Sequence, residues 1–265
     1  RGHSPASHPK NTGATLTAPI IPGAEPESID GGPNGALVVH GFTGNPSSMR
    51  GVAHALSDAG FAVELPLLPG HGTAIEDMIP TGWSDWLGAA EDAYGKLAAR
   101  VPGKVVIVGL SMGGALTCWL ASDHPEVAGI AAINAVVTKP EGMEDLVQQL
   151  LDNGDEVMGG VGSDIADPDS HESAYAETPL RPLLTLVEAA TEFQSRLPRI
   201  ACPVLIITSR QDHVVPPENS DVLAESVTGP VERLFLERSY HVATQDYDKA
   251  EVEAKVVEFA TRVTS

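Results

Sequence analysis

The chain has 265 residues, of which 42% are hydrophobic, and this is enough apolar material for one large core in a single α/β domain. Its 36 acidic and 16 basic residues give a net charge of -20, so its surface repels phosphate backbones and nucleic acid is not an expected partner. No apolar run has membrane-spanning length and no basic leader precedes a hydrophobic segment, which predicts a cytoplasmic protein without stable membrane insertion.

The beginning of the chain differs in composition from the rest. Residues 1–18 contain few apolar side chains and many Ser, Pro, Thr and Gly residues, which indicates a disordered tail or an expression remnant. Residues 19–265 are predicted to form one domain. Within it, Ile20–Pro33 is expected to be a loop that leads into the first buried strand.

Strands and helices alternate along this domain. Short apolar runs predict strands at 36–40, 61–65, 105–108, 129–133, 204–208 and 231–236. Apolar residues at helical spacing predict helices over 49–59, 83–98, 115–121, 220–226 and 252–263. This alternation implies parallel pairing through right-handed crossovers, and hence an α/β fold with a mostly parallel central sheet and helices on both faces.

The alternation stops after the strand that ends near Asn134. From about 137 to 185 the sequence offers no strand candidate. Its main feature is an apolar stripe at helical spacing, formed by Met143, Leu146, Val147, Leu150 and Leu151. A helix with an apolar face and no sheet beneath it must bury that face elsewhere. We therefore predict a small cap, inserted at about 137–185, over the carboxyl edge of the sheet.

The strongest chemical signal lies in the stretch 105–115. Four β-forming residues run into a Gly-X-Ser-X-Gly sequence centred on Ser111, and a buried helix follows. Strand, sharp turn and helix in this order are the context of a nucleophile elbow, in which a strained turn raises the serine Oγ above the sheet. A Cβ at Gly109 or Gly113 would collide where the strand and the helix cross. Ser111 is therefore the predicted nucleophile.

A nucleophilic serine needs an adjacent base, and the base needs a group that fixes its tautomer. In sheets of this kind both residues follow later strands, with the acid before the histidine. Asp212 follows the predicted strand 204–208, and His241 follows the predicted strand 231–236. Ser111, Asp212 and His241 are thus predicted as the catalytic residues.

Other titratable residues are assigned supporting positions. His213 adjoins Asp212 on one loop, where it cannot point back at that carboxylate and also reach the serine, so we expect it to support the loop. His40 and His71 are expected to support backbone turns by hydrogen bonding and packing. Glu237, at the end of a strand, is expected to face solvent.

Attack by a hydroxyl creates an oxyanion that must meet preset donors, each of which lowers the barrier by about 3 to 4 kcal/mol. The backbone N–H of Met112 directly follows the predicted nucleophile and is the first candidate. The turn after the first predicted strand should supply the second donor, which makes the backbone N–H of Phe42 the other candidate.

Several segments together resemble a known family. They are LVVHGFTG at 37–44, PGHGT at 69–73, GLSMGG at 109–114, GSD at 162–164, DHVVPP at 212–217 and SYHVAT at 239–244. From about Ile21 to the C-terminus they are similar to the bacterial monoacylglycerol lipases and the closely related small carboxylesterases of the α/β-hydrolase superfamily. The resemblance implies the α/β-hydrolase fold, the same three catalytic residues, and an oxyanion hole formed by the amides of Phe42 and Met112.

The resemblance also assigns two positions in the cap. Val161 stands where the family has an apolar residue that bears on specificity, and it is smaller than the isoleucine expected there. One methylene in such a pocket changes the discrimination between substrates by only about 1 to 3 kcal/mol. Glu172 stands at the position of a carboxylate near the polar head of the substrate.

These observations favour a serine ester hydrolase that cleaves monoacylglycerol to glycerol and free fatty acid through an acyl-enzyme on Ser111. The acyl chain would lie against the cap stripe, while Glu172 and Asn134 meet the glycerol hydroxyls. No metal or cofactor is expected. The expected partner is a small lipid ester, with transient contact with lipid aggregates. Two alternatives stay open: a general carboxylesterase or thioesterase without glycerol preference, and a ligand receptor that turns over negligibly.

Overall fold

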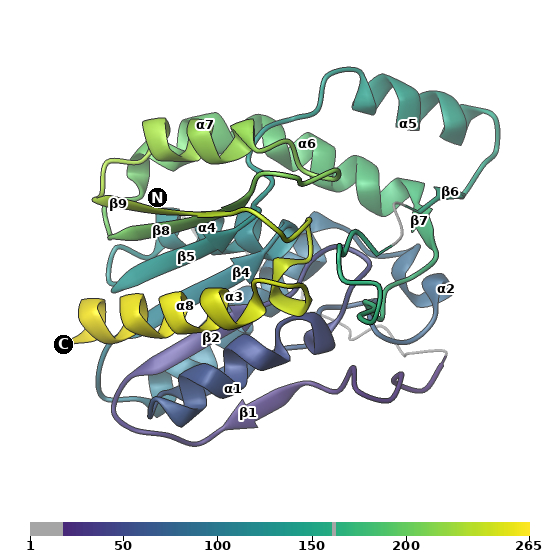
Figure 1. Cartoon of the computed structure of the whole chain (residues 1–265). Helices are drawn as coiled ribbons and strands as arrows, with labels where there is room; N and C mark the ends of the chain where they lie inside the picture. Colours follow the sequence, from purple (N-terminus) through teal and green to yellow (C-terminus); the bar gives the residue numbers. More distant parts are fainter. Residues whose placement is uncertain (1–17, 161–162) are drawn as a thin grey trace, which may run out of the picture.

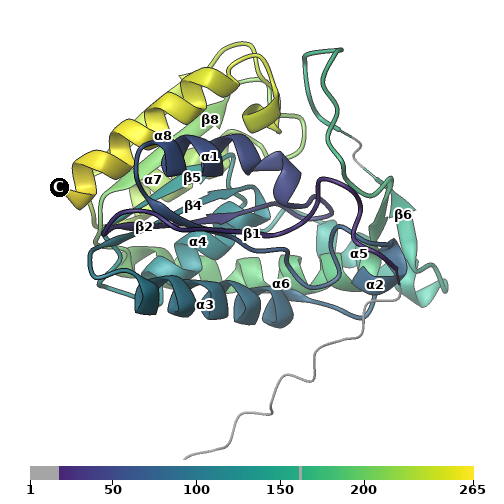
Figure 2. The ribbon, with the colours of Figure 1, turned by 90° about the horizontal axis from the view of Figure 1, so that it is seen from below.

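A central sheet lies between two layers of helices in the computed structural model, which describes residues 18–160 and 163–265 (Figures 1 and 2). In these residues the sheet has seven strands in the order β1-β3-β2-β4-β5-β8-β9. They are β1 (Glu27–Ile29), β2 (Gly35–Val39), β3 (Ala62–Leu65), β4 (Val105–Leu110), β5 (Gly129–Ile133), β8 (Val204–Ser209) and β9 (Val231–Leu236). Within this described sheet β1 pairs antiparallel with β3 and the other neighbouring pairs are parallel, so the predicted mostly parallel sheet is confirmed.

Helices cover both faces of the sheet, as predicted (Figure 2). One face carries α1 (Arg50–Asp58) and α8 (Lys249–Thr264). The other carries α3 (Trp83–Arg100), α4 (Met112–Asp123), α6 (Leu180–Arg196) and α7 (Glu218–Ser226). Near the carboxyl ends of the parallel strands lie α2 (Ile75–Met78), α5 (Met143–Asp152) and the antiparallel pair β6 (Val157–Gly159) and β7 (Glu177–Pro179) (Figure 1).

Side chains of the central strands alternate between two cores, because successive residues of a strand point to opposite faces. In β2, Leu37 and Val39 pack in the core beneath α3, α4 and α6, whereas Ala36 and Val38 pack in the core beneath α1 and α8. All five residues of β2 and all six of β4 are buried. Burial on both faces explains why these strands read as continuous apolar runs in the sequence.

The helix that follows Ser111 is buried on all sides. Every residue of α4 from Met112 to Ser122 is buried. A helix that is apolar all round has to lie inside the molecule, so α4 packs between the sheet and the outer helices. The turn that carries Ser111 is therefore held between two interior elements.

Three short strands differ from the prediction. β1 lies in the segment Ile20–Pro33, which was expected to be a loop, and β6 and β7 lie between 137 and 185, where no strand was expected. Each has three residues, which is too short for a period of two to emerge from the sequence. Their positions are set by pairing with a partner strand, and that partner is not visible in the local pattern.

The long helix α6 also differs from the prediction, which placed no element at 186–203. A usable signal was present, because Leu186, Val187, Ala190 and Phe193 recur at helical spacing and are all buried. Pro182 lies in the first turn, where its missing N–H would have no partner inside the helix. It therefore marks the start of α6 and does not interrupt it.

The segment between β5 and β8 contributes α5, β6, β7 and α6. α5 packs against α6, and Val147 of α5 is fully buried. The predicted cap range, 137–185, ends inside α6, so that helix belongs to both the cap and the core layer. Residues 1–17 of the predicted tail lie outside the described residues. Within the described ranges, no helix combines the length and the apolar character that crossing a bilayer requires.

The Phe193→Ala variant should be strongly destabilised. Phe193 is fully buried and its ring meets those of Trp83 and Trp119 with centroids 5.8 Å and 5.6 Å away. Removing such a ring from a packed core costs about 3 to 5 kcal/mol of the free energy of unfolding. Urea unfolding measures this loss. The control Leu146→Ala changes a residue that is 45% exposed and should cost about 0.5 kcal/mol or less; equal losses would contradict the packing of α6.

Candidate active site

Ser111 is held in a strained turn between β4 and α4. Its torsions are φ 57° and ψ -119°, a conformation that residues other than glycine rarely adopt. A Cβ on Gly109 would lie 2.1 Å from the carbonyl oxygen of Gly113, and a Cβ on Gly113 would lie 2.2 Å from that of Val39. The strand and the helix can cross this closely only because both positions are glycine. The structure thus has the tight turn that the sequence predicts.

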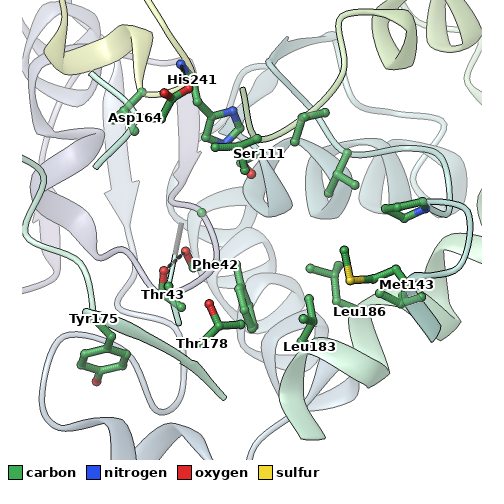
Figure 3. A pocket seen from close by; sticks show the side chains of 18 of the residues that line it. Phe42, Thr43, Ser111, Met143, Asp164, Tyr175, Thr178, Leu183, Leu186 and His241 are labelled. Carbon is green, nitrogen blue, oxygen red and sulfur yellow. Dashed lines mark hydrogen bonds between the residues drawn. The ribbon is translucent and has the colours of Figure 1, made fainter. Parts of the chain in front are cut away.

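His241 lies beside Ser111 (Figure 3), and Asp212 anchors its ring. The distance between Nδ1 of His241 and Oδ2 of Asp212 is 2.7 Å. The other carboxylate oxygen of Asp212 accepts the backbone N–H groups of Val214 and Val215, both at 2.8 Å. An ionised carboxylate has only acceptors, so this arrangement fixes the proton on Nδ1 and leaves Nε2 as an acceptor. The three predicted catalytic residues therefore lie together.

The turn after β2 adjoins Ser111. A Cβ on Gly41 would lie 3.3 Å from Cβ of Ser111, and the next residue, Phe42, lines the same cavity. The N–H of Met112 lies in the first turn of α4, where amide groups have no partner inside the helix. Among the described residues, neither this N–H nor that of Phe42 is paired with an acceptor. Both amides are therefore available as hydrogen-bond donors near Ser111.

His40 braces this turn from the interior. Its Nδ1 donates to the carbonyl oxygen of Gly41 at 2.9 Å, and its Nε2 accepts the N–H of Leu68 at 3.1 Å. Burial, and then the neighbouring ring of His71, lower the pKa of His40 to about 3, so the ring is neutral and can make both bonds. Burial also lowers the pKa of His71 to about 4. Both histidines have the supporting positions that the sequence predicts.

Glu172 reaches the same turn from the cap segment. A Cβ on Gly44 would lie 2.9 Å from Oε1 of Glu172, so the carboxylate lies against the turn. The N–H of Glu172 donates to Oγ of Ser163 at 3.0 Å. Burial raises the pKa of Glu172 to about 6, although the nearby His241 acts in the opposite direction. A partly buried carboxyl group therefore lies against the turn that follows β2 and is close enough to His241 to interact with it electrostatically.

A cavity of about 220 Å³ joins these groups. Its polar arm includes Asp164, Glu172 and Thr43. Its apolar arm runs between α5 and α6, where Figure 3 shows the side chains of Met143, Leu183 and Leu186 on the side away from His241. The cavity is lined further by Val136, Pro140, Met158, Tyr175, Thr178, Val187, Ala190, Val214 and Val215.

The comparison with protein families decides the classification. A family model described as the alpha/beta hydrolase family matches residues 36–255, which is most of the chain. The chain belongs to the alpha/beta hydrolase family. The predicted α/β-hydrolase fold is thereby confirmed.

Relatives of this hydrolase match it over nearly its whole length. A thermostable monoacylglycerol lipase of Bacillus sp. (strain H-257) is 42% identical over 245 residues, which cover 91% of this chain and 96% of the relative. A carboxylesterase of Bacillus subtilis (strain 168) is 26% identical, covering 90% of this chain and 97% of the relative. A solved structure described with the metagenome-derived lipolytic enzymes LipS and LipT has a TM-score of 0.88 and 39% identity, covering 92% of this chain and 100% of that one. The predicted resemblance is confirmed.

In this hydrolase Asn134 does not face the substrate cavity, and the prediction that it meets glycerol is wrong. Asn134 is 3% exposed. Its Nδ2 donates to Oγ of Ser209 at 3.0 Å and to the carbonyl oxygen of His241 at 2.7 Å, and its Oδ1 accepts the N–H of Ser209 at 2.8 Å. The amide is thus fully used in tying the end of β8 to the histidine loop. Val161, the other predicted cap residue, lies outside the described residues.

The remaining candidates of the hydrolase also have protein partners. His213 is exposed and its Nδ1 lies 2.8 Å from Oδ1 of Asp164. Glu237 is exposed and pairs with Arg210. Both agree with the supporting or solvent-facing positions expected. In residues 18–160 and 163–265, no group of three or more His, Cys, Asp or Glu side chains is arranged to hold a metal ion.

Two cap residues of the hydrolase were missed by sequence reasoning. The hydroxyl of Tyr175 donates to the carbonyl oxygen of Gly70 at 2.8 Å, and the N–H of Tyr175 donates to that of Thr43 at 3.1 Å. Tyr175 thereby fastens the cap segment to the turn that follows β2. Its local signal in the sequence is an isolated aromatic residue in a polar stretch. Asp164, in the GSD motif, contacts the loops that carry Asp212 and His241.

The Glu172→Gln variant should gain stability relative to the wild type as the pH rises. Burial raises the pKa of Glu172 from 4.5 to about 6, so the folded chain holds this proton more tightly than the unfolded chain does. The stability contributed by the protonated group is present in full below the ordinary pKa and is lost as the pH rises through about 6. The difference between the two pKa values corresponds to about 2 kcal/mol.

The measurement is the free energy of unfolding of both proteins at about pH 4 and about pH 8, where we expect the variant to gain about 2 kcal/mol on the wild type over this interval. The exposed Glu177, changed to Gln, is the control. A difference between Glu172→Gln and wild type that does not depend on pH would contradict the burial of this carboxyl group.

Proposed function

We propose that this protein is a serine ester hydrolase that cleaves monoacylglycerol to glycerol and free fatty acid. One observation carries the proposal. A carboxyl group, that of Glu172, lies against the turn next to the serine, and an apolar arm of the same cavity opens away from it. A polyol head and a hydrocarbon tail joined at one ester bond fit these two surfaces.

Ser111 is the proposed nucleophile, with His241 as general base and Asp212 as the group that orients the base. The serine Oγ attacks the ester carbonyl while Nε2 of His241 takes its proton. Asp212 keeps the other ring nitrogen protonated through the 2.7 Å bond and stabilises the imidazolium that forms. The proton then passes to glycerol as it leaves, and a water activated by His241 releases the fatty acid.

The tetrahedral intermediates carry a negative oxygen, for which the N–H groups of Phe42 and Met112 are the proposed donors. A fixed donor is worth about 3 to 4 kcal/mol of barrier, because it needs no reorganisation during the reaction. The support for this assignment is that both amides lack an acceptor among the described residues and adjoin Ser111. The brace formed by His40 keeps the first of these amides in place.

We assign recognition of the glycerol group to Glu172, and recognition of the acyl chain to the apolar arm of the cavity. A carboxyl group can accept hydrogen bonds from two glycerol hydroxyls, and it does so best when ionised. The acyl chain would lie among Met143, Leu183 and Leu186. Transient contact with lipid aggregates is part of the proposal, since Leu146 on α5 is 45% exposed close in sequence to Met143.

The relatives support this reading to different degrees. The relative that is 42% identical is a monoacylglycerol lipase, and the one that is 26% identical is a carboxylesterase. A general carboxylesterase or thioesterase therefore remains the nearest alternative. A receptor without turnover is the alternative of another class.

The first test compares ester substrates on the purified protein. We expect a higher kcat/KM for 1-monolauroylglycerol than for ethyl laurate or a lauroyl thioester, because only the glyceride offers hydroxyls to Glu172. The Ser111→Ala variant should lose roughly 10⁶ in kcat for every substrate. It should also lose labelling by a fluorophosphonate. Equal or poorer turnover of the glyceride would favour a general carboxylesterase or thioesterase. A wild-type protein that is neither labelled nor active would favour the receptor without turnover.

The second test separates the alcohol subsite from the chemistry. Glu172→Ala should lower kcat/KM for 1-monolauroylglycerol by about 10 to 100-fold, the range for a lost hydrogen bond to a charged group, and should leave ethyl laurate nearly unchanged. Glu177→Ala, an exposed carboxylate on β7, is the matched control and should change neither substrate. If Glu172→Ala lowers kcat/KM equally for both substrates, the assignment of the glycerol subsite to this residue is wrong.

A further inference from the structure

The loop from Ser163 to Ser170 leaves the cap and packs on the loop that carries His241. The buried carboxylate of Asp246 accepts the N–H groups of Ala166 at 2.8 Å and Asp167 at 3.0 Å, and also that of Tyr240 at 2.8 Å. The hydroxyl of Ser170 donates to the carbonyl oxygen of Gln245 at 2.7 Å. A piece of the cap segment is therefore fixed to the immediate surroundings of the histidine.

Asp164, at the start of this loop, lies near His241 (Figure 3) and contacts the loops of both the acid and the base. Its Oδ2 accepts the N–H of His241 at 3.0 Å and the N–H of His213, the residue after Asp212, at 3.1 Å. Its Oδ1 lies 2.8 Å from Nδ1 of His213, and its backbone carbonyl accepts the N–H of Val242 at 3.1 Å. One residue thus makes four hydrogen bonds to residues at or beside the base and the acid.

These contacts leave the backbone of residue 241 little freedom. Its N–H is held by Asp164, and its carbonyl oxygen is held from the other side by Asn134 at 2.7 Å. With both polar groups of the residue fixed, the direction of its Cα–Cβ bond is set, and the bond from Nδ1 to Asp212 sets the ring. The Asp164 side chain is only 12% exposed, so its charge is poorly screened and its bonds to the two N–H groups are strong.

We propose that Asp164 is a positioning residue for the hydrolytic reaction, holding the loops of Asp212 and His241 in the register that brings the imidazole to Ser111. This rests on the proposed function of the three residues. Asp164 has no part in the proton transfers themselves. Because Glu172 lies on the same cap segment, the residue proposed to bind glycerol and the residue that positions the base are carried by one piece of chain.

Three variants test the proposal. Asp164→Ala removes the acceptor of both amides, whereas Asp164→Asn keeps an oxygen that can accept them and turns its NH₂ group toward His213. Asp169→Ala is the matched control, since Asp169 is exposed in the same loop and its side chain has no hydrogen bond or ion pair among the described residues.

We expect Asp164→Ala to lower kcat by about 10²-fold, the effect of a displacement near 1 Å, with KM changing by less than about threefold, for glyceride and ethyl ester alike. Asp164→Asn should recover most of this loss, and Asp169→Ala should match the wild type. The low-field NMR resonance of the proton between His241 and Asp212 should shift or broaden in Asp164→Ala and stay in the other two variants.

Hydrogen exchange on the wild-type protein covers the case in which Asp164→Ala does not fold. The amide of His213 belongs to an exposed residue, so slow exchange there reports its bond to Asp164. Rapid exchange at this amide would overturn the proposal. So would an Asp164→Ala variant with the same kcat and NMR resonance as Asp169→Ala, or an Asp164→Ala variant in which only KM rises. The NMR and exchange measurements need no substrate, so they stand or fall separately from the proposed hydrolase activity.

Discussion

The close crossing of β4 and α4 is the constraint on which the rest of the site depends. A strand and a helix meet at Ser111 with so little space that Gly109 and Gly113 admit no Cβ, and the residue between them takes a strained positive φ. Packing on both sides of the sheet supplies the energy that holds this turn. Since α4 is buried all round, the strain cannot relax by moving the helix outward.

The other proposed catalytic groups are positioned relative to that crossing by polar contacts. His40 ties the turn that follows β2 to the loop at Leu68, and Asn134 ties the end of β8 to the loop of His241. The cap segment adds Asp164 and Tyr175 from the other side. The packed crossing of β4 and α4 thus holds Ser111. Buried or half-buried hydrogen bonds position the turn after β2, the loop of His241 and the cap segment relative to it.

Much of this arrangement could be predicted from the sequence, because strong local patterns mark it. Ser111 and Asp212 follow the fully buried strands β4 and β8, His241 follows β9, and the buried strands stand out in the sequence as continuous apolar runs. The direction of the Asn134 amide could not be predicted, because it depends on hydrogen bonds to segments far away in the sequence. The contacts of Asp164 were inaccessible for the same reason. The three-residue strands are formed by their partners, and no local pattern encodes them.

The burial of α4 also bears on when the chain becomes reactive. The strained backbone at Ser111 depends on the packing of β2, β4 and α4 against one another, so a chain in which these elements are unpacked lacks the turn that presents this hydroxyl. The proposed nucleophile is therefore presented only where the core around it is packed.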